Sequence, residues 1–308
     1  MTRRIPLLVA LALVVLACDD DPKGNNVNNV NNVNNANNVN NVNNANNVNN
    51  VTEFEAIPGA RCTQENLVGT VTVGGYESGG GLELSAQLYD KPAIARTTLT
   101  LSDAACGFWE ALPPGFCEPA CTGDTTCDHT GTCVSLPMPV EELALALRAG
   151  EQLQTFEPQY AGQLYGPITL PGRTFSATLT FDGLTVSLAE TAVPEPLVDL
   201  AGTWHGAHEA PEGLDFAWTQ PADPAGAFVT TDIPINHHAM SATHTVCTVD
   251  AADPGFSVAQ DMLTPLAVVT GLEFQGLEHV RFAAAVTPRG CVEFRWRIWH
   301  FPSWTYPR

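Results

Sequence analysis

The stretch TFSATLTFDGLTVSLAE, from Thr174 to Glu190, decides the fold class. Apolar and polar residues alternate in both halves, and a period of two is typical of a β-strand with one buried face. Between the halves, Asp182-Gly183 suits the positive backbone angles of a tight turn. The stretch therefore predicts a β-hairpin. Its core-facing residues are Phe175, Ala177, Leu179 and Phe181.

Alternating segments recur on both sides of this hairpin and predict an all-β chain. Glu141–Gln154 is ambiguous, because its residue types favour helix whereas its leucines alternate, and we interpret it as strand. One short helix is expected, at Phe256–Leu266. The other predicted strands are VGTVTV (68–73), LELSAQL (82–88), RTTLTLS (96–102), GLDFAWTQPADP (213–224), AFVTTDIPI (227–235), ATHTVCTVD (242–250), LEHVRFAAAVT (277–287) and GCVEFRWRIWHF (290–301).

A proline-rich passage, TAVPEPLVDLAGTW (191–204), predicts a domain junction. In the segment that follows it, Leu214, Phe216 and Trp218 share one face, which resembles an early strand of fibronectin-type sandwiches. We therefore predict two antiparallel β-sandwich-like domains, at residues 61–198 and 199–308. Each is long enough to bury a core of its own.

The N-terminus has the features of an export signal. Arg3 and Arg4 precede an apolar run at 5–16, which is too short for a bilayer core that needs about 20 residues. Val15-Leu16-Ala17-Cys18 resembles the lipobox of bacterial lipoproteins. The resemblance implies that residues 1–17 are a signal peptide and that Cys18 becomes an acylated N-terminus anchored in a lipid bilayer. Inner and outer membrane both stay open.

Nine Asn-Asn-Val or Asn-Asn-Ala triplets fill residues 25–51. Such a segment has no aromatic residue and no charge, so it cannot bury enough surface to offset its ordering entropy. We predict a disordered tether over residues 18–60. A stacked solenoid or an asparagine ladder is the alternative.

Eight cysteines follow Cys18, and an even number in an exported chain predicts disulfides. Four of them define a small disulfide-rich insert at 116–134, with the sequence CEPACTGDTTCDHTGTC from residue 117. Zinc binding with His129 is less favoured, since paired C-x2-C spacings are absent. Three pairings are open inside the insert, and the interleaved one would resemble growth-factor-like cysteine modules. The insert holds Cys117, Cys121, Cys127 and Cys133; outside it, the simplest local pairing joins Cys62 with Cys106 and Cys247 with Cys291.

The whole layout resembles lipoproteins of myxobacteria and related predatory bacteria. The shared features are the lipobox at Cys18, the asparagine-rich spacer, the cysteine insert and a late RGCVEF strand. The resemblance implies an address in the bacterial cell envelope and a β fold. It implies no activity.

The charge of the chain excludes one class of partner. With 13 Lys and Arg against 33 Asp and Glu, the formal net charge is −20. A field of that sign repels phosphate backbones, so no nucleic-acid binding is expected.

Histidine-bearing segments of the second predicted domain are candidates for a metal site. Their spacings match no known metalloenzyme motif, and histidines in β-loops are more often solvated than ligating. The candidate ligands are His205, His208, His237, His238 and His244.

The C-terminal stretch FRWRIWHFPSWTYPR is rich in tryptophan and arginine. In a strand, Phe294, Trp296 and Ile298 face one way, which predicts a core strand with arginines on its outer face. The functional alternative is an exposed aromatic shelf for a glycan or an envelope protein. That shelf would consist of Arg295, Arg297, Trp299 and Trp304.

Together these observations predict a membrane-anchored cell-envelope lipoprotein that serves as a non-catalytic binding or structural module and needs no cofactor. The alternative is a metal-dependent or glycan-processing enzyme that uses the histidine-bearing segments. No G-x-S-x-G motif or phosphate-binding loop is present.

Overall fold

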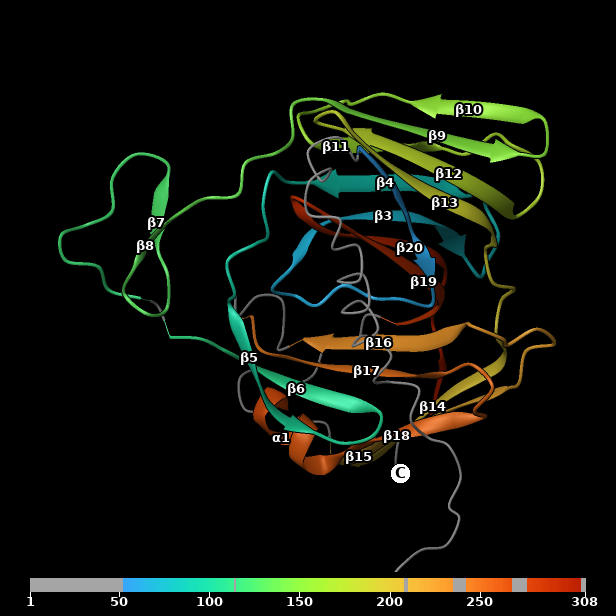
Figure 1. Ribbon diagram of the computed structural model, residues 1–308. Helices are drawn as coiled ribbons and strands as arrows, with labels where there is room; N and C mark the ends of the chain where they lie inside the picture. The colour runs from blue at the N-terminus through green and yellow to red at the C-terminus, as the bar shows by residue number, and fades with distance from the viewer. Residues whose placement is uncertain (1–51, 114, 208–209, 235–241, 268–275, 306–308) are drawn as a thin grey trace, which may run out of the picture.

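The computed structural model describes residues 52–113, 115–207, 210–234, 242–267 and 276–305 (Figure 1). Over these ranges the chain is mostly β-structure with one helix, so the predicted all-β class is confirmed. Within the same ranges, no helix has the length and apolar character needed to cross a membrane. The signal peptide, Cys18 and the asparagine triplets lie outside the described residues.

Three sheets of the described residues make up the body of the protein. The five-stranded sheet has the order β1-β13-β12-β9-β10, and the four-stranded sheet has the order β18-β15-β14-β21. The strands of the five-stranded sheet are β1 (Glu53–Glu55), β9 (Leu143–Ala149), β10 (Gln152–Phe156), β12 (Thr174–Phe181) and β13 (Leu184–Ala192). Those of the four-stranded sheet are β14 (Val198–Ala207), β15 (Ala210–Thr219), β18 (Gly255–Ala259) and β21 (Ser303–Thr305).

The third sheet has ten strands and runs through the middle of the molecule (Figure 1). Its order is β11-β4-β3-β20-β19-β16-β17-β6-β5, and β2 pairs with β19. These strands are β2 (Ile57–Pro58), β3 (Leu67–Tyr76), β4 (Glu83–Leu88), β5 (Thr97–Ser102), β6 (Cys106–Ala111), β11 (Gln163–Pro167), β16 (Phe228–Pro234), β17 (His244–Asp250), β19 (Leu277–Thr287) and β20 (Gly290–His300).

The ten-stranded sheet is shared by two sandwiches. One half, from β11 to β19, packs on the five-stranded sheet around a first core that includes Phe175, Phe181 and Trp296. The other half, from β16 to β6, packs on the four-stranded sheet and on helix α1 (Gln260–Ala267). Leu214 and Phe216 lie in this second core.

The two cores do not follow the predicted ranges 61–198 and 199–308. Most core residues of the C-terminal hairpin of β19 and β20 belong to the first core, with Leu277 of β19 in the second, whereas Cys106 and Phe108 of β6 belong to the second. The cause is the parallel pairing of β20 with β3, which joins opposite ends of the described chain. Parallel partners need a long connection, and here almost the entire chain supplies it. Parallel ladders also join β1 to β13 and β14 to β21, so the sheets are mixed.

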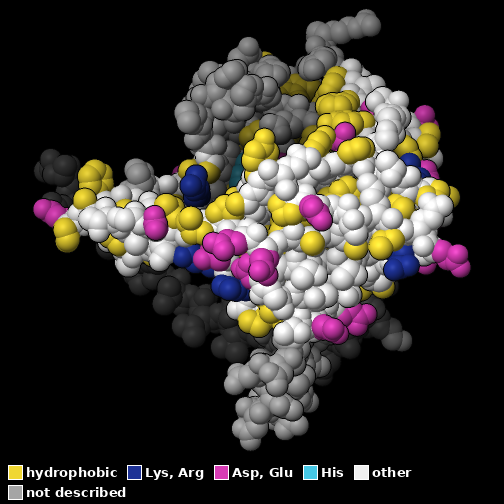
Figure 2. Space-filling view, turned by 90° about the horizontal axis from the view of Figure 1, so that it is seen from above, with side chains coloured by type: hydrophobic (Ala, Val, Ile, Leu, Met, Phe, Trp, Pro, Cys, Tyr) yellow, Lys and Arg dark blue, Asp and Glu magenta, His cyan; other side chains and the backbone are white. Residues whose placement is uncertain are grey.

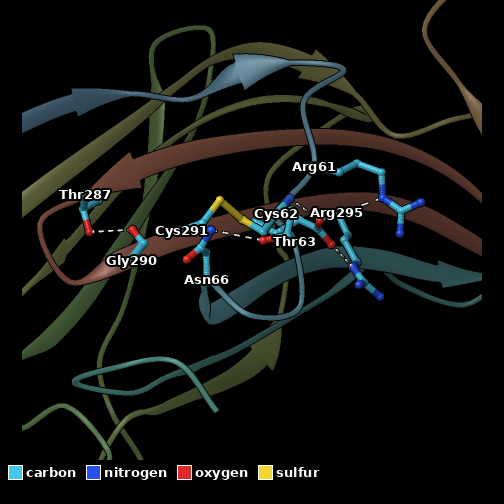
Figure 3. Close-up of a disulfide and its surroundings, with 9 residues drawn as sticks. Arg61, Cys62, Thr63, Asn66, Thr287, Gly290, Cys291 and Arg295 are labelled. Atoms are coloured by element: carbon cyan, nitrogen blue, oxygen red, sulfur yellow. Dashed lines mark hydrogen bonds and ion pairs between the residues drawn. A yellow bond between two sulfur atoms is a disulfide. The ribbon is translucent and has the colours of Figure 1, made fainter. Parts of the chain in front are cut away.

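Two of the predicted disulfides are wrong. Cys62 pairs with Cys291, and Cys106 pairs with Cys247. Local pairing fails because β17 is the neighbour of β6 and places Cys247 directly opposite Cys106. Figure 3 shows Cys62 reaching the start of β20, where the Cys291 amide donates to the Asn66 carbonyl at 2.7 Å.

Inside the insert the disulfides are interleaved. Cys117 bonds to Cys127, and Cys121 bonds to Cys133. The only hydrogen-bonded strands of the described insert are β7 (Thr125–Cys127) and β8 (Cys133–Ser135), which pair with each other. The insert projects away from the body (Figure 1), so its bridges and not a core hold it together.

The predicted tether, residues 18–60, extends too far. Glu53–Glu55 forms β1 alongside β13, and Ile57–Pro58 forms β2 alongside β19. The physical reason is burial, since Ala56 is 1% exposed in the first core and Phe54 packs against that core. Within the described residues, regular structure therefore begins at Glu53.

Candidate functional site

The candidate site is the side of the ten-stranded sheet that points away from both cores, which we call the outer face. Alternation sends apolar residues such as Val71, Val73 and Leu84 into the core, and polar residues to the outer face. The register then aligns Gln163, Gln87, Thr70 and Glu293 across four strands. Charged and neutral groups occupy different parts of this face.

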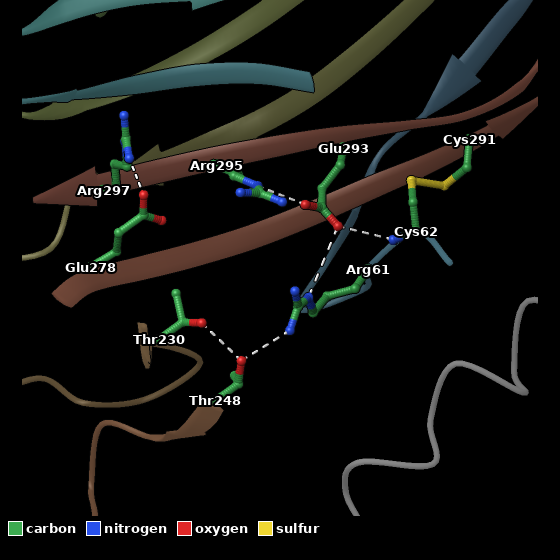
Figure 4. Close-up of polar contacts among 9 residues, drawn as sticks. All are labelled: Arg61, Cys62, Thr230, Thr248, Glu278, Cys291, Glu293, Arg295 and Arg297. Carbon is green, nitrogen blue, oxygen red and sulfur yellow. Dashed lines mark hydrogen bonds and ion pairs between the residues drawn. A yellow bond between two sulfur atoms is a disulfide. The ribbon is translucent and has the colours of Figure 1, made fainter. Parts of the chain in front are cut away.

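The charged part contains a buried carboxylate. Glu293, 2% exposed, accepts hydrogen bonds from the Cys62 amide at 3.0 Å and from the Arg295 Nε at 2.7 Å (Figure 4). The Arg61 Nε lies 4.0 Å from the same carboxylate. The Arg61 guanidinium also lies 4.3 Å from the centre of the Phe282 ring and donates to Thr248. Each of these charges therefore has a partner inside the protein.

A second ion pair continues along the same strands. Arg297 bonds to the buried Glu278, and its guanidinium lies 5.1 Å from the Trp299 ring centre. This is the arrangement expected for a core strand whose outer arginines pair with acids and stack on aromatic rings. Arg295 and Arg297 are thereby engaged in structural contacts.

The neutral part of the outer face is hollowed into a groove over β3, β4 and β11. It has a volume of about 500 Å³. Apart from Ala86 and Leu164, every lining residue carries a hydroxyl or an amide. The lining residues are Thr70, Thr72, Ser85, Ala86, Gln87, Gln159, Tyr160, Gln163, Leu164 and Tyr165. The groove lies in the size range of small-molecule sites, about 300–1,000 Å³.

Hydrogen bonds at the rim fix part of this lining. The Tyr165 hydroxyl donates to Glu83 at 3.0 Å, and this hydrogen bond raises the pKa of the Tyr165 phenol. The Gln159 amide donates to the Tyr165 carbonyl at 3.0 Å. Gln87 donates to the Tyr89 hydroxyl. The aromatic ring of Tyr165 is held in place at its polar end while 52% of the residue stays exposed.

Other groups of the groove have no such partners. Within the described residues, the side chains of Thr70, Thr72, Ser85 and Gln163 make no hydrogen bond to the protein. The charged part of the same face is satisfied internally, whereas the groove presents unpaired donors and acceptors. A ligand can take over the hydrogen bonds that such groups otherwise make with water.

The predicted shelf is not one surface. Trp299 lies on the outer face, at the end of β20. Trp304 lies on β21 of the four-stranded sheet, where it packs against the second core and meets the Phe216 ring edge-on. Both tryptophans are half-buried. The aromatic character of this segment was predictable from the sequence, but the separation of the two tryptophans onto two sheets was not.

The predicted metal ligands are not assembled in the described part of the chain. His205 lies on β14 and bonds to Asp215 at 2.7 Å, whereas His244 lies on β17 and stacks on Trp109. The pKa of Asp215 is lowered by hydrogen bonds from Ser257 and His205. His208, His237 and His238 lie outside the described residues. Among the described residues, one group of three potential metal ligands lies close together, namely Cys117, Cys121 and Cys127. All three of these cysteines are in disulfides.

Two buried histidines were not singled out from the sequence. The His279 ring bonds through Nδ1 to the Glu195 carbonyl at 2.7 Å, and burial lowers its pKa to about 4. The His300 ring bonds to Glu77 at 2.8 Å, and burial lowers its pKa too. Both contact the proline-rich junction, since the Leu197 amide donates to His300. Their role is to fasten the junction between the two sandwiches.

The negative charge of the protein is not gathered at one place on the face seen from above. Acidic side chains are scattered there among polar and apolar ones (Figure 2). The net charge of −20 disfavours anionic ligands generally.

Comparisons with known proteins leave the function open. No family model matches the chain, and no curated protein matches it. Among solved structures, the chicken CNTN1 FN1–FN3 domains align over 78% of this chain at 8% identity, with a TM-score of 0.19. The chain spans 66% of that structure's length.

Two further structures give similar values. The receptor tyrosine kinase Torso aligns at 12% identity over 68% of this chain and 74% of its own, with a TM-score of 0.16. Collagen adhesin from S. aureus aligns at 10% identity over 77% of this chain and 94% of its own, with a TM-score of 0.12. TM-scores this low do not establish a shared fold. The β-sandwich architecture is instead shown by the strands and the two cores of this chain.

Proposed function

We propose that this protein is a non-catalytic binding module of the bacterial cell envelope, held on a membrane by acylated Cys18. Its ligand-binding surface is the groove over β3, β4 and β11. The observation that carries the proposal is the set of unpaired hydroxyl and amide groups in this groove, next to charged groups that are paired within the protein.

The composition of the groove favours binding over chemistry. Its lining contains no Asp, Glu, His, Cys or Lys, and the pKa of the Tyr165 phenol is raised by its hydrogen bond to Glu83, away from neutrality. A general acid or base works best with a pKa near the operating pH, and the lining offers no such group. Hydroxyls and amides with exposed aromatic rings are suited to holding a ligand without changing it.

The anchor is supported by the sequence around Cys18. A short apolar run followed by Leu16-Ala17-Cys18 fits a lipobox, and two or more acyl chains hold a protein stably in a bilayer. Replacing Cys18 by alanine is expected to move the protein from the membrane fraction to the soluble fraction after cell disruption. Intact-mass analysis of the purified protein should show a chain that begins at Cys18 and carries acyl groups. An unmodified N-terminus would contradict the anchor.

Binding is tested separately from anchoring. The Cys18→Ala chain, which cannot insert acyl groups into a bilayer, is mixed with isolated envelope fragments and sedimented. We expect it to co-sediment, and we expect the double variant Gln163→Ala, Tyr165→Ala to bind about tenfold more weakly, because a hydrogen bond and an aromatic contact are lost.

A matched control is available on the same protein. Phe116 is 93% exposed in the disulfide-rich insert and does not line the groove, and Gln152 is exposed on β10 of the five-stranded sheet. The double variant Gln152→Ala, Phe116→Ala should bind as the parent does. Equal binding by the groove variant and the parent, with equal thermal stability, would refute the groove as the binding surface.

A further inference from the structure

The groove carries no charge of its own. None of its ten lining residues is Asp, Glu, Lys, Arg or His. The nearest cation along the sheet is Arg295, opposite Thr72, and its Nε is bonded to Glu293. At the rim, Glu83 accepts the Tyr165 hydroxyl and adds a negative charge. An anionic ligand would lose water in this groove without finding a free counter-charge, and the rim carboxylate of Glu83 is already bonded to the Tyr165 hydroxyl; these groups favour a neutral ligand.

The hydrogen-bonding groups of the groove are of a mixed kind. Thr70, Thr72 and Ser85 each offer a hydroxyl that both donates and accepts, and Gln163 offers an amide with both functions. Such a surface matches a ligand whose own groups both donate and accept, which is the property of sugar hydroxyls. A ligand with only acceptors or only donors would leave half of these groups unpaired.

Aromatic rings complete the match. Tyr160 is 73% exposed and Tyr165 is 52% exposed, and both line the groove. Aromatic rings in a largely polar groove offer apolar surface to a ligand that has apolar patches between its hydroxyls. The C–H faces of a pyranose ring are patches of this kind.

We propose that the groove binds a neutral oligosaccharide or a neutral segment of a polysaccharide; the inference rests on the proposed binding function and names its ligand class. The groove extends over three adjacent strands. Its length therefore favours a chain of sugar rings over a single one.

A peptide is less suited to this position. Peptides that add to a sheet use the free backbone edge of an outermost strand. The groove lies over side chains of β3, β4 and β11, of which β3 and β4 have a hydrogen-bonded partner on either side and only β11 is an outermost strand. A ligand seated over the side chains of these strands meets mainly hydroxyls and amides, whereas an added peptide strand would have to lie beside β11.

The test is a calorimetric titration of the full-length protein, purified in detergent. The probes are soluble neutral oligosaccharides built from glucose, xylose, mannose or N-acetylglucosamine, an acidic oligogalacturonide, and an uncharged extended peptide. We expect at least one neutral oligosaccharide to bind. Its affinity should change less than about twofold between low and high salt, because no charged group lines the groove.

The groove variants decide where the ligand binds. The double variant Gln163→Ala, Tyr165→Ala should weaken the affinity about tenfold, and the control variant Gln152→Ala, Phe116→Ala should leave it unchanged. Since Tyr165 also bonds to Glu83, the single variant Thr72→Val serves as a second probe that keeps the rim intact. It should weaken binding severalfold.

The failure of this inference can be told apart from failure of the binding function. If no neutral oligosaccharide binds, or if only the acidic probe or the peptide binds, the ligand class is wrong. The binding function still stands in that case, provided that the groove variant loses its retention on envelope fragments. If groove variants bind envelope fragments as the parent does, both proposals fall.

Discussion

At the scale of single residues, the charged side chains of the outer face pair with each other, whereas several polar side chains of the groove make no hydrogen bond to the described part of the protein. Glu293 is 2% exposed and is bonded to the Cys62 amide and to Arg295, while Arg61 lies nearby. A buried carboxylate with these partners holds the segment of Arg61 and Cys62 against β20. The alternation of the β20 sequence predicted which side the arginines face, but nothing in it identified the acids that neutralise them.

Replacing Glu293 by alanine tests this network. The change leaves Arg61 and Arg295 without their counter-charge, and we expect a loss of about 2 kcal/mol in the free energy of unfolding. The loss is smaller than for a fully enclosed pair, because both guanidinium groups reach water. The control is Glu190→Ala, an exposed strand residue, which should change stability by less than about 0.5 kcal/mol. Equal denaturation midpoints for the two variants would contradict the role of Glu293.

His279 makes the stability depend on pH. Its pKa is about 4 in the folded protein against an ordinary 6.5, so the unfolded chain binds more protons between these values. The free energy of unfolding therefore falls as the pH is lowered through this window. From pH 7 to pH 5 the loss due to His279 is about 2 kcal/mol.

The variant His279→Asn isolates this contribution. Asparagine keeps a donor for the Glu195 carbonyl but does not titrate. Chemical denaturation of both proteins at pH 7 and pH 5 should show a shallower decrease for the variant. A decrease of the same size in both would mean that His279 does not carry the effect.

At the scale of strands and helices, the sequence predicted the type and place of each element better than which strands pair with each other. The hairpin of β12 and β13 turns at Asp182 and Gly183, both with positive φ, as the Asp-Gly pair predicts. The segment Glu141–Gln154 is indeed β-structure, and α1 starts inside the expected helical segment. Periodicity fixes such elements locally, but it contains no information on which strand lies beside which.

The pairing of β3 with β20 depends on a close backbone approach at Gly74. A Cβ atom there would lie 2.4 Å from the Arg297 carbonyl oxygen. We expect Gly74→Ala to reduce the free energy of unfolding by about 1–3 kcal/mol through overpacking. Gly81→Ala is the matched control, since a Cβ at Gly81 meets nothing within 4 Å. If both variants unfold at the same temperature, the two strands are not this close.

At the scale of the whole molecule, two sandwiches share one sheet whose outer face carries the groove. The two-sandwich architecture was predictable from the density of strands and from the proline-rich junction. The exchange of segments was not, because the β3–β20 ladder and the two longest disulfides join residues far apart in sequence. The groove was unpredictable for the same reason, since β11 reaches β4 across 74 intervening residues between Leu88 and Gln163.

The most direct test of this shared sheet is a map of the disulfides in the purified, non-reduced protein. Proteolysis and mass spectrometry should find one peptide pair that joins Cys62 to Cys291 and another that joins Cys106 to Cys247. These links connect positions 229 and 141 residues apart, which the shared ten-stranded sheet brings together. Links between Cys62 and Cys106 and between Cys247 and Cys291 would instead indicate two sequential domains, and would contradict the shared sheet and the groove built on it.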